Sequence, residues 1–158
     1  DCGSCGSALK SYAARFAGDE KWQNRAKKFS SKVMGFTEYL SVVGYEPKLK
    51  QEITVTYHDS CHLSRGQGIK NQPRELLKKA ANFIELPEAS VCCGGAGTFQ
   101  VDFPEISDKI LAAKIKNINS TKAALVAAEC PACMLQLAKG EGKNEFQVVH
   151  ISQILANS

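Results

Sequence analysis

The chain has 158 residues, a formal net charge of +4, 44% hydrophobic residues and 23% charged residues. This composition is typical of a folded domain and excludes a disordered or low-complexity chain. No apolar run reaches the roughly 18 residues of a membrane-spanning helix, and the mild, dispersed positive charge lacks the interleaved aromatic residues of a nucleic-acid-binding surface.

The first third of the chain is predicted to be helical. Apolar residues recur at steps of three and four through residues 19–44, which predicts one long amphipathic helix. Gly44 is a typical residue just past a helix end, and a polar connection containing Pro47 follows it. We therefore expect residues 19–52 to form a long helix and a linker.

From residue 53 the pattern changes to short β-branched or apolar segments alternating with helices. Helices are expected to begin near Asn71, Pro104 and Pro131, and a last one to cover residues 151–156. The strands are expected at residues 53–57, 83–86, 123–128 and 146–150. Such alternation is typical of βαβ units. Residues 53–158 are therefore predicted to form an α/β domain with a mostly parallel sheet of about four strands and flanking helices.

Seven cysteines are the most informative residues of the sequence. An odd count, with two C-x-x-C pairs and one adjacent pair, is a poor disulfide framework and favours a reducing compartment. Five of them follow predicted strands, and the carboxyl ends of parallel strands share one edge of a sheet. The sequence therefore predicts that these thiols converge there: Cys61, Cys92, Cys93, Cys130 and Cys133.

The cysteine pattern favours a polynuclear metal centre. A C-x-x-C at a helix start directs two sulfurs to one site, where backbone N–H groups stabilise thiolates. An adjacent pair reaches two metal atoms more easily than one, and five thiolates exceed the four ligands of Zn²⁺. Gly94, Gly95 and Gly97 allow close backbone approach and N–H donation to sulfur. A structural zinc site using four of the thiols, and a metal-free thiol–disulfide site at Cys130 and Cys133, stay open as alternatives.

Polar residues near the cysteines are expected to have local roles. His58 and His62 are predicted to form loop hydrogen bonds. A hydrogen bond to the ligands or a proton role, and direct metal ligation by either histidine, stay open as alternatives. His150 and the acids Asp59 and Glu129 are predicted to be caps.

The beginning of the chain repeats a later segment. Asp1-Cys2-Gly3-Ser4-Cys5, followed by Leu9, matches Glu129-Cys130-Pro131-Ala132-Cys133, followed by Leu137. We therefore interpret residues 1–18 as the tail of an earlier copy of the unit. On this interpretation Cys2 and Cys5 lack their partners within this chain.

Four motifs surround the cysteines of the predicted α/β domain. They are His58-Asp59-Ser60-Cys61-His62-Leu63, Cys92-Cys93-Gly94-Gly95-Ala96-Gly97-Thr98-Phe99, Pro104-Glu105-Ile106-Ser107 and Glu129-Cys130-Pro131-Ala132-Cys133. Together they resemble the cysteine-rich CCG domain, which occurs twice in one of the subunits of heterodisulfide reductase, and also in the iron–sulfur subunits of bacterial glycolate and lactate oxidation systems. The resemblance covers residues 53–158 as a complete second copy and residues 1–9 as the end of a first. The first two motifs look closer to the glycolate and lactate branch.

The resemblance implies a function as well as a fold. It implies a 4Fe-4S cluster, noncubane in the heterodisulfide reductase branch, that relays electrons or reduces a disulfide within an oxidoreductase complex. The implied cofactor-binding residues are Cys61, Cys92, Cys93, Cys130, Cys133, Gly94 and Gly95, with the five cysteines as metal ligands and no catalytic residue assigned. A structural zinc-binding interaction module of such a complex is the alternative.

The resemblance also implies partners. They are flavin-containing or other dehydrogenase subunits and a ferredoxin-like iron–sulfur domain, whose cysteine runs are absent from this sequence. The implied location is cytoplasmic, with membrane association at the inner face only through partners. The chain is thus expected to be part of an enzyme complex rather than a complete enzyme.

Overall fold

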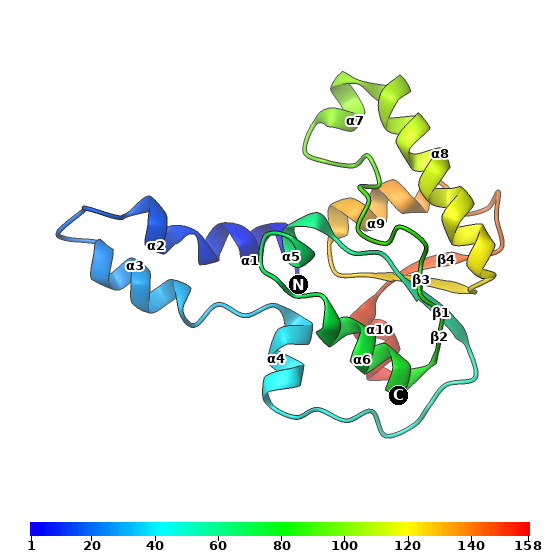
Figure 1. Ribbon diagram of the computed structural model, residues 1–158, viewed down its shortest axis with the longest axis horizontal. Helices are drawn as coiled ribbons and strands as arrows, with labels where there is room; N and C mark the ends of the chain where they lie inside the picture. Colours follow the sequence, from blue (N-terminus) through cyan, green and yellow to red (C-terminus); the bar gives the residue numbers. More distant parts are fainter.

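The computed structural model describes residues 1–158 as an α/β domain with a helical arm (Figure 1). The strands are β1 (Thr54–Tyr57), β2 (Asn82–Phe83), β3 (Leu125–Ala128) and β4 (Gln147–His150). The helices are α1 (Gly3–Lys10), α2 (Tyr12–Arg15), α3 (Gln23–Ser30), α4 (Phe36–Val42), α5 (Cys61–Ser64), α6 (Asn71–Ala80), α7 (Phe99–Asp102), α8 (Pro104–Thr121), α9 (Pro131–Ala138) and α10 (Ile151–Ala156). The predicted strands and the helices of the domain are therefore present, although β2 is shorter than expected.

The four strands form one parallel sheet in the order β2-β1-β3-β4. Tyr57 pairs with Ala127, and Ala128 with His150, so β1, β3 and β4 end at the same edge. This is the edge at which open α/β sheets bind ligands. The prediction of a mostly parallel, four-stranded α/β fold is confirmed.

A hydrophobic core covers each face of the sheet. One core joins Tyr57 and Ala127 to apolar residues of α6 and α10, and the other joins Val126 to α8 and α9. Val126 and Ala127 face opposite cores because successive side chains of a strand alternate. The second core also contains three of the cysteines, Cys93, Cys130 and Cys133.

The predicted single helix over residues 19–44 is wrong, because two helices, α3 and α4, replace it. Residues 31–35 interrupt it, and Gly35 adopts an extended conformation with φ −71° and ψ 159°. A Cβ at Gly35 would lie 2.9 Å from Ile69 Cδ1, so a larger residue here would require the end of the Ile69 side chain to move. The chain thus packs against a distant residue at the point where the local helical periodicity predicts a continuous helix.

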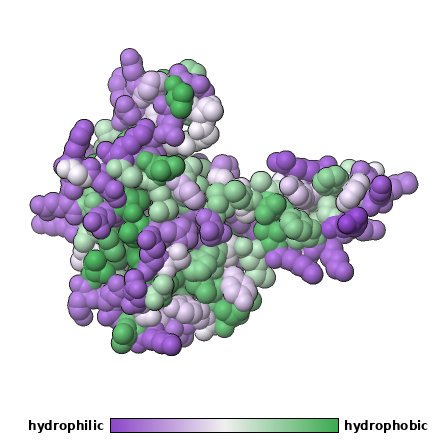
Figure 2. Space-filling model, turned by 180° about the vertical axis from the view of Figure 1, so that it is seen from behind, coloured by the Kyte–Doolittle hydropathy of each residue, from purple (hydrophilic) through white to green (hydrophobic).

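The helices α1, α2 and α3 form an arm that projects from the domain (Figure 1). Within it Tyr12 stacks on Phe29 with ring centroids 5.7 Å apart, and Arg25 lies over the Trp22 ring. Trp22 and Phe29 remain 39% and 45% exposed, and hydrophobic side chains show among hydrophilic ones along the arm (Figure 2). No helix of the structure has the length and apolar character needed to span a membrane.

Candidate metal centre

Five thiols line one small cavity at the carboxyl edge of the sheet. Cys61 begins α5 directly after β1, and the adjacent pair Cys92 and Cys93 lies in the loop between β2 and α7. Cys130 is the N-cap of α9, and Cys133 lies in its first turn. The cavity has a volume of about 50 Å³, and all seven cysteines of the chain are free. The predicted convergence of the three cysteine groups is confirmed.

The packed thiols shift one another's pKa values in opposite directions. Interaction with the thiols of Cys133 and Cys92 lowers the pKa of Cys93 far below the ordinary value. Interaction with Cys133, assisted by backbone N–H groups at the start of α9, lowers the pKa of Cys130 to about 4. The pKa values of Cys92 and Cys133 are raised, and the largest cause is the interaction with Cys93 for Cys92 and with Cys130 for Cys133. Thiols whose pKa is lowered in this way lose their protons more easily, and the thiolate is the form that binds metals.

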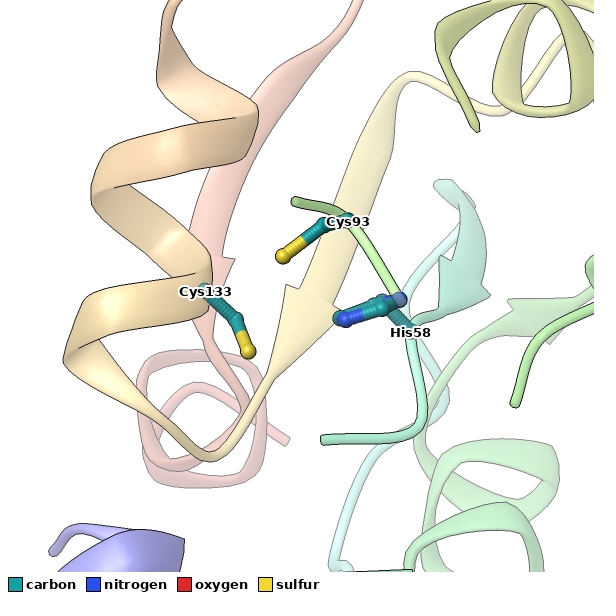
Figure 3. Close-up of side chains that lie close together, drawn as sticks. All are labelled: His58, Cys93 and Cys133. Carbon is teal, nitrogen blue, oxygen red and sulfur yellow. The ribbon is translucent and has the colours of Figure 1, made fainter. Parts of the chain in front are cut away.

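His58 joins two of these thiols in the interior. Its ring and the sulfurs of Cys93 and Cys133 offer ligand atoms that lie within 4.8 Å of one another, and all three residues are buried. Figure 3 shows the three side chains converging from β1's carboxyl end, the cysteine loop and α9. The Nδ1 atom of His58 is buried without a hydrogen-bond partner. This position favours the alternatives in which His58 takes part in the site over a purely local loop role.

The glycine loop packs tightly between the thiols and α9. The Gly94 backbone N–H donates to Cys92 Sγ at 3.3 Å, an N–H to sulfur contact of the kind that the sequence predicted. Gly94 has a φ of +88°, and a Cβ at Gly95 would lie 2.8 Å from Gln136 Cβ. Gly94 is thus needed for its conformation, and Gly95 for the close approach of the loop to α9.

The N-terminal C-x-x-C also lies beside the cavity. Cys2 is the N-cap of α1 with φ −152° and ψ 114°, and Cys130 caps α9 with φ −139° and ψ 115°. Ser4 Oγ lies 2.9 Å from His62 Nδ1 and 3.6 Å from Cys130 Sγ. The two similar sequences therefore build similar helix starts, which the Gly3 N–H joins by donating to the Glu129 carbonyl at 3.0 Å. That residues 1–18 end an earlier repeat stays a prediction.

Comparison with known proteins places the chain in a family. A family model described as a cysteine-rich domain, CCG, matches residues 55–138, more than half of the chain. The chain belongs to the CCG cysteine-rich domain family. It is 36% identical to Lactate utilization protein A of Oceanobacillus iheyensis, over 97% of this chain and 65% of that protein. It is 34% identical to the Probable glycolate oxidase iron-sulfur subunit of Bacillus subtilis, over 98% of this chain and 37% of that protein.

A third relative is Lactate utilization protein A of Bacillus subtilis, which is 32% identical over 97% of this chain and 67% of that protein. The chain therefore spans about two thirds of the length of the lactate utilization proteins and little more than a third of the glycolate oxidase subunit.

The two acids beside the thiols of this CCG domain are not caps, so that prediction is wrong. Asp59 forms two hydrogen bonds of 2.9 Å with Arg74, whose guanidinium also binds Glu85. Because the two carboxylates surround it, the pKa of Arg74 is raised. The local sequence around Asp59 gives no signal for an arginine fifteen positions away.

Glu129 is fully buried and accepts hydrogen bonds from two other buried side chains. Thr37 Oγ1 and Tyr57 OH each lie 3.0 Å from its Oε1, and the Thr37 N–H reaches its Oε2. Burial raises the pKa of Glu129, although these bonds act in the opposite direction. Sequence reasoning missed this arrangement because Thr37 precedes Glu129 by 92 positions.

Two histidines outside the buried group have local contacts. His62 is exposed and bonds Ser4, while His150 Nδ1 accepts from the Ser152 N–H at 3.2 Å. His150 is therefore a cap of α10, as predicted, and it does not line the cavity.

Proposed function

We propose that this chain is the iron–sulfur electron-transfer part of an oxidoreductase complex that oxidises lactate or glycolate. The observation that carries the proposal is the convergence of five free thiols on one cavity. Two relatives support the choice of complex, because one is named for lactate utilization and the other as a glycolate oxidase iron-sulfur subunit.

The residues present fit a polynuclear iron–sulfur cluster. Thiolate sulfur is the usual protein ligand of such clusters, and hydrogen bonds to sulfur tune their potential. The proposed ligands are Cys61, Cys92, Cys93, Cys130 and Cys133, with Gly94 and Gly95 lining the same site. When bound, a 4Fe-4S cluster would supply one-electron redox chemistry there.

The protein contributes charge, hydrogen bonds and exclusion of water. Cys93 and Cys130 are buried, and a low local dielectric strengthens their attraction for a cation. The Gly94 N–H lies against the sulfur of Cys92 and stabilises negative charge on it. Cys61 and Cys92 are only partly buried and therefore form the side of the centre nearer to solvent.

This exposed side suits exchange of electrons with a partner. We propose a flavin-containing or other dehydrogenase subunit as donor and a ferredoxin-like iron–sulfur domain as the next carrier. The reduction of a disulfide at the same centre, as in heterodisulfide reductase, is the second form of the proposal. In both forms the chain works as part of a complex, in the cytoplasm.

A mononuclear zinc site is the alternative that one observation favours. His58, Cys93 and Cys133 already form a buried group whose ligand atoms lie within 4.8 Å of one another. Such a site would organise the loops for contact with partner subunits. It would leave Cys61 and Cys92 without a metal.

Metal and sulfide analysis of single cysteine variants separates the two functions. The chain is purified without air as the wild type, as Cys61→Ser, as Cys92→Ser and with the exposed Cys5→Ser as a matched control. We expect iron and acid-labile sulfide in the wild type and in the control, and loss of most of both from the other two. If the chain instead holds one zinc ion that neither Cys61→Ser nor Cys92→Ser removes, the structural zinc site is established.

A further inference from the structure

One face of α8 holds both ends of the loop that carries the adjacent cysteines. Ser107 Oγ donates to the Gly94 carbonyl at 3.0 Å, just after the pair. Lys114 Nζ donates to the Glu88 carbonyl at 2.6 Å, four residues before it. The two α8 residues are seven positions apart, which is two helical turns or about 10.5 Å. This helix therefore brackets Cys92 and Cys93.

Lys114 is a buried cation without a carboxylate partner. The residue is 2% exposed, and its neighbours on the helix face, Leu111 and Ile118, belong to the core that contains Cys93. The Glu88 carboxylate accepts from Asn117 at 2.8 Å instead, and none of the ion pairs in the structure includes Lys114. A buried charge is costly unless an opposite charge lies within reach.

The thiolates are the counter-charge that this core offers. Asp59, the other acid close to the loop, is already neutralised by its two hydrogen bonds with Arg74. Burial lowers the pKa of Lys114, and the sulfur of Cys93 belongs to the same core that surrounds it. Glu88, whose carbonyl accepts the hydrogen bond from Lys114, has a positive φ of 52°, a backbone conformation that L-residues rarely adopt.

We propose that Lys114 is a positioning residue that fixes the cysteine loop through Glu88 and acts as the buried counter-cation of the thiolate centre. This inference rests on the proposed iron–sulfur function and adds a determinant of its potential. A fixed positive charge stabilises the reduced centre more than the oxidised one, because the reduced centre carries one more negative charge. Lys114 therefore raises the reduction potential of the centre.

Four variants separate the charge of Lys114 from its hydrogen bond. Lys114→Gln keeps a donor for the Glu88 carbonyl without the charge, Lys114→Met removes both, and Lys114→Arg keeps the charge. Lys116→Met is the matched control, because Lys116 is exposed on the same helix. The readout is the midpoint potential of the anaerobically loaded full chain, measured by redox titration with EPR detection. Circular dichroism checks that each variant is folded.

We expect the Gln and Met variants to shift the reduction equilibrium about tenfold toward the oxidised centre, which for a one-electron couple is about 59 mV. The Arg variant and the Lys116→Met control should keep the wild-type potential. Loss of iron from a folded Gln variant but not from the Arg variant would also support the inference.

Three results would overturn it. A Gln variant with the wild-type potential shows that the charge has no role, and unfolding of the Gln, Met and Arg variants alike shows a purely structural lysine. A folded wild-type chain without iron and sulfide removes the proposed function and this inference together. The first two results leave the proposed function intact, so the two failures are distinguishable.

Discussion

Gly95 provides the sharpest test of how the cysteine loop is packed. Its substitution by alanine adds a single methyl group, whose carbon would lie 2.8 Å from Gln136 Cβ and 3.2 Å from the Ala132 carbonyl oxygen. Both neighbours belong to α9, which also carries Cys133. Gln136 is fully buried and donates to Ser107 Oγ at 2.9 Å, so it has no free space into which it can move.

The magnitude follows from two opposing effects. Overpacking a well-filled interior costs about 1–3 kcal/mol. Reduced freedom of the unfolded chain offsets roughly 0.4–1 kcal/mol of this cost. We therefore expect Gly95→Ala to lower the free energy of unfolding by roughly 1–2 kcal/mol. The displaced α9 should also move Cys133 away from Cys93 and reduce the iron content after anaerobic loading.

Urea unfolding of the metal-free chain measures the first effect, and iron analysis of the loaded chain measures the second. Ala96→Ser is the matched control, because Ala96 is the next residue and is exposed. With a slope of about 2 kcal/mol per molar urea, the middle of the usual range, the expected loss moves the unfolding midpoint by roughly 0.5–1 M. A Gly95→Ala chain with the stability and iron content of the control would refute the packing argument.

Three changes at buried polar contacts, and Lys79→Met at an exposed ion pair as the control for the first, test the metal-free chain further. Arg74→Met should lower the unfolding free energy by about 3 kcal/mol, because buried Asp59 loses two charge-assisted hydrogen bonds. Lys79→Met should lower it by less than about 1 kcal/mol, because the ion pair of Lys79 is exposed. Glu129→Gln should flatten the pH dependence of the urea midpoint. Burial raises the pKa of Glu129 above its ordinary 4.5, so between the unfolded and folded pKa values the folded state keeps a proton that the unfolded chain has lost. The stability of the wild type therefore falls as the pH rises through that window, and the variant should not show this fall. Tyr57→Phe should cost about 1.5–3 kcal/mol at neutral pH by removing a donor to that carboxylate, and an unchanged midpoint would show that the bond contributes nothing.

Local patterns were sufficient to predict the domain and the position of its cysteines. The strands lie in short β-branched or apolar segments, and each cysteine group follows one of them, so the parallel topology brings the thiols to one edge. Cys61 and Cys130 could be placed at this edge because strand direction alone determines which ends of a parallel sheet meet.

The features that the sequence did not reveal depend on contacts between distant residues. The break before α4 lies where Gly35 packs against Ile69, while the apolar periodicity continues across it. Likewise, the hydrogen bonds of Glu129 come from residues far away in the chain. The sequence could not decide between a loop role and a site role for His58, because its proximity to Cys93 exists only in the folded protein.

The most direct test of the proposed function is X-ray absorption at the iron edge of the anaerobically purified chain, combined with iron and sulfide analysis. We expect the spectrum to show sulfur ligands around iron together with iron–iron scattering, which only a polynuclear cluster gives. Isolated metal ions with a nitrogen ligand and no iron–iron scattering would contradict it, and would favour a mononuclear site at His58, Cys93 and Cys133 instead.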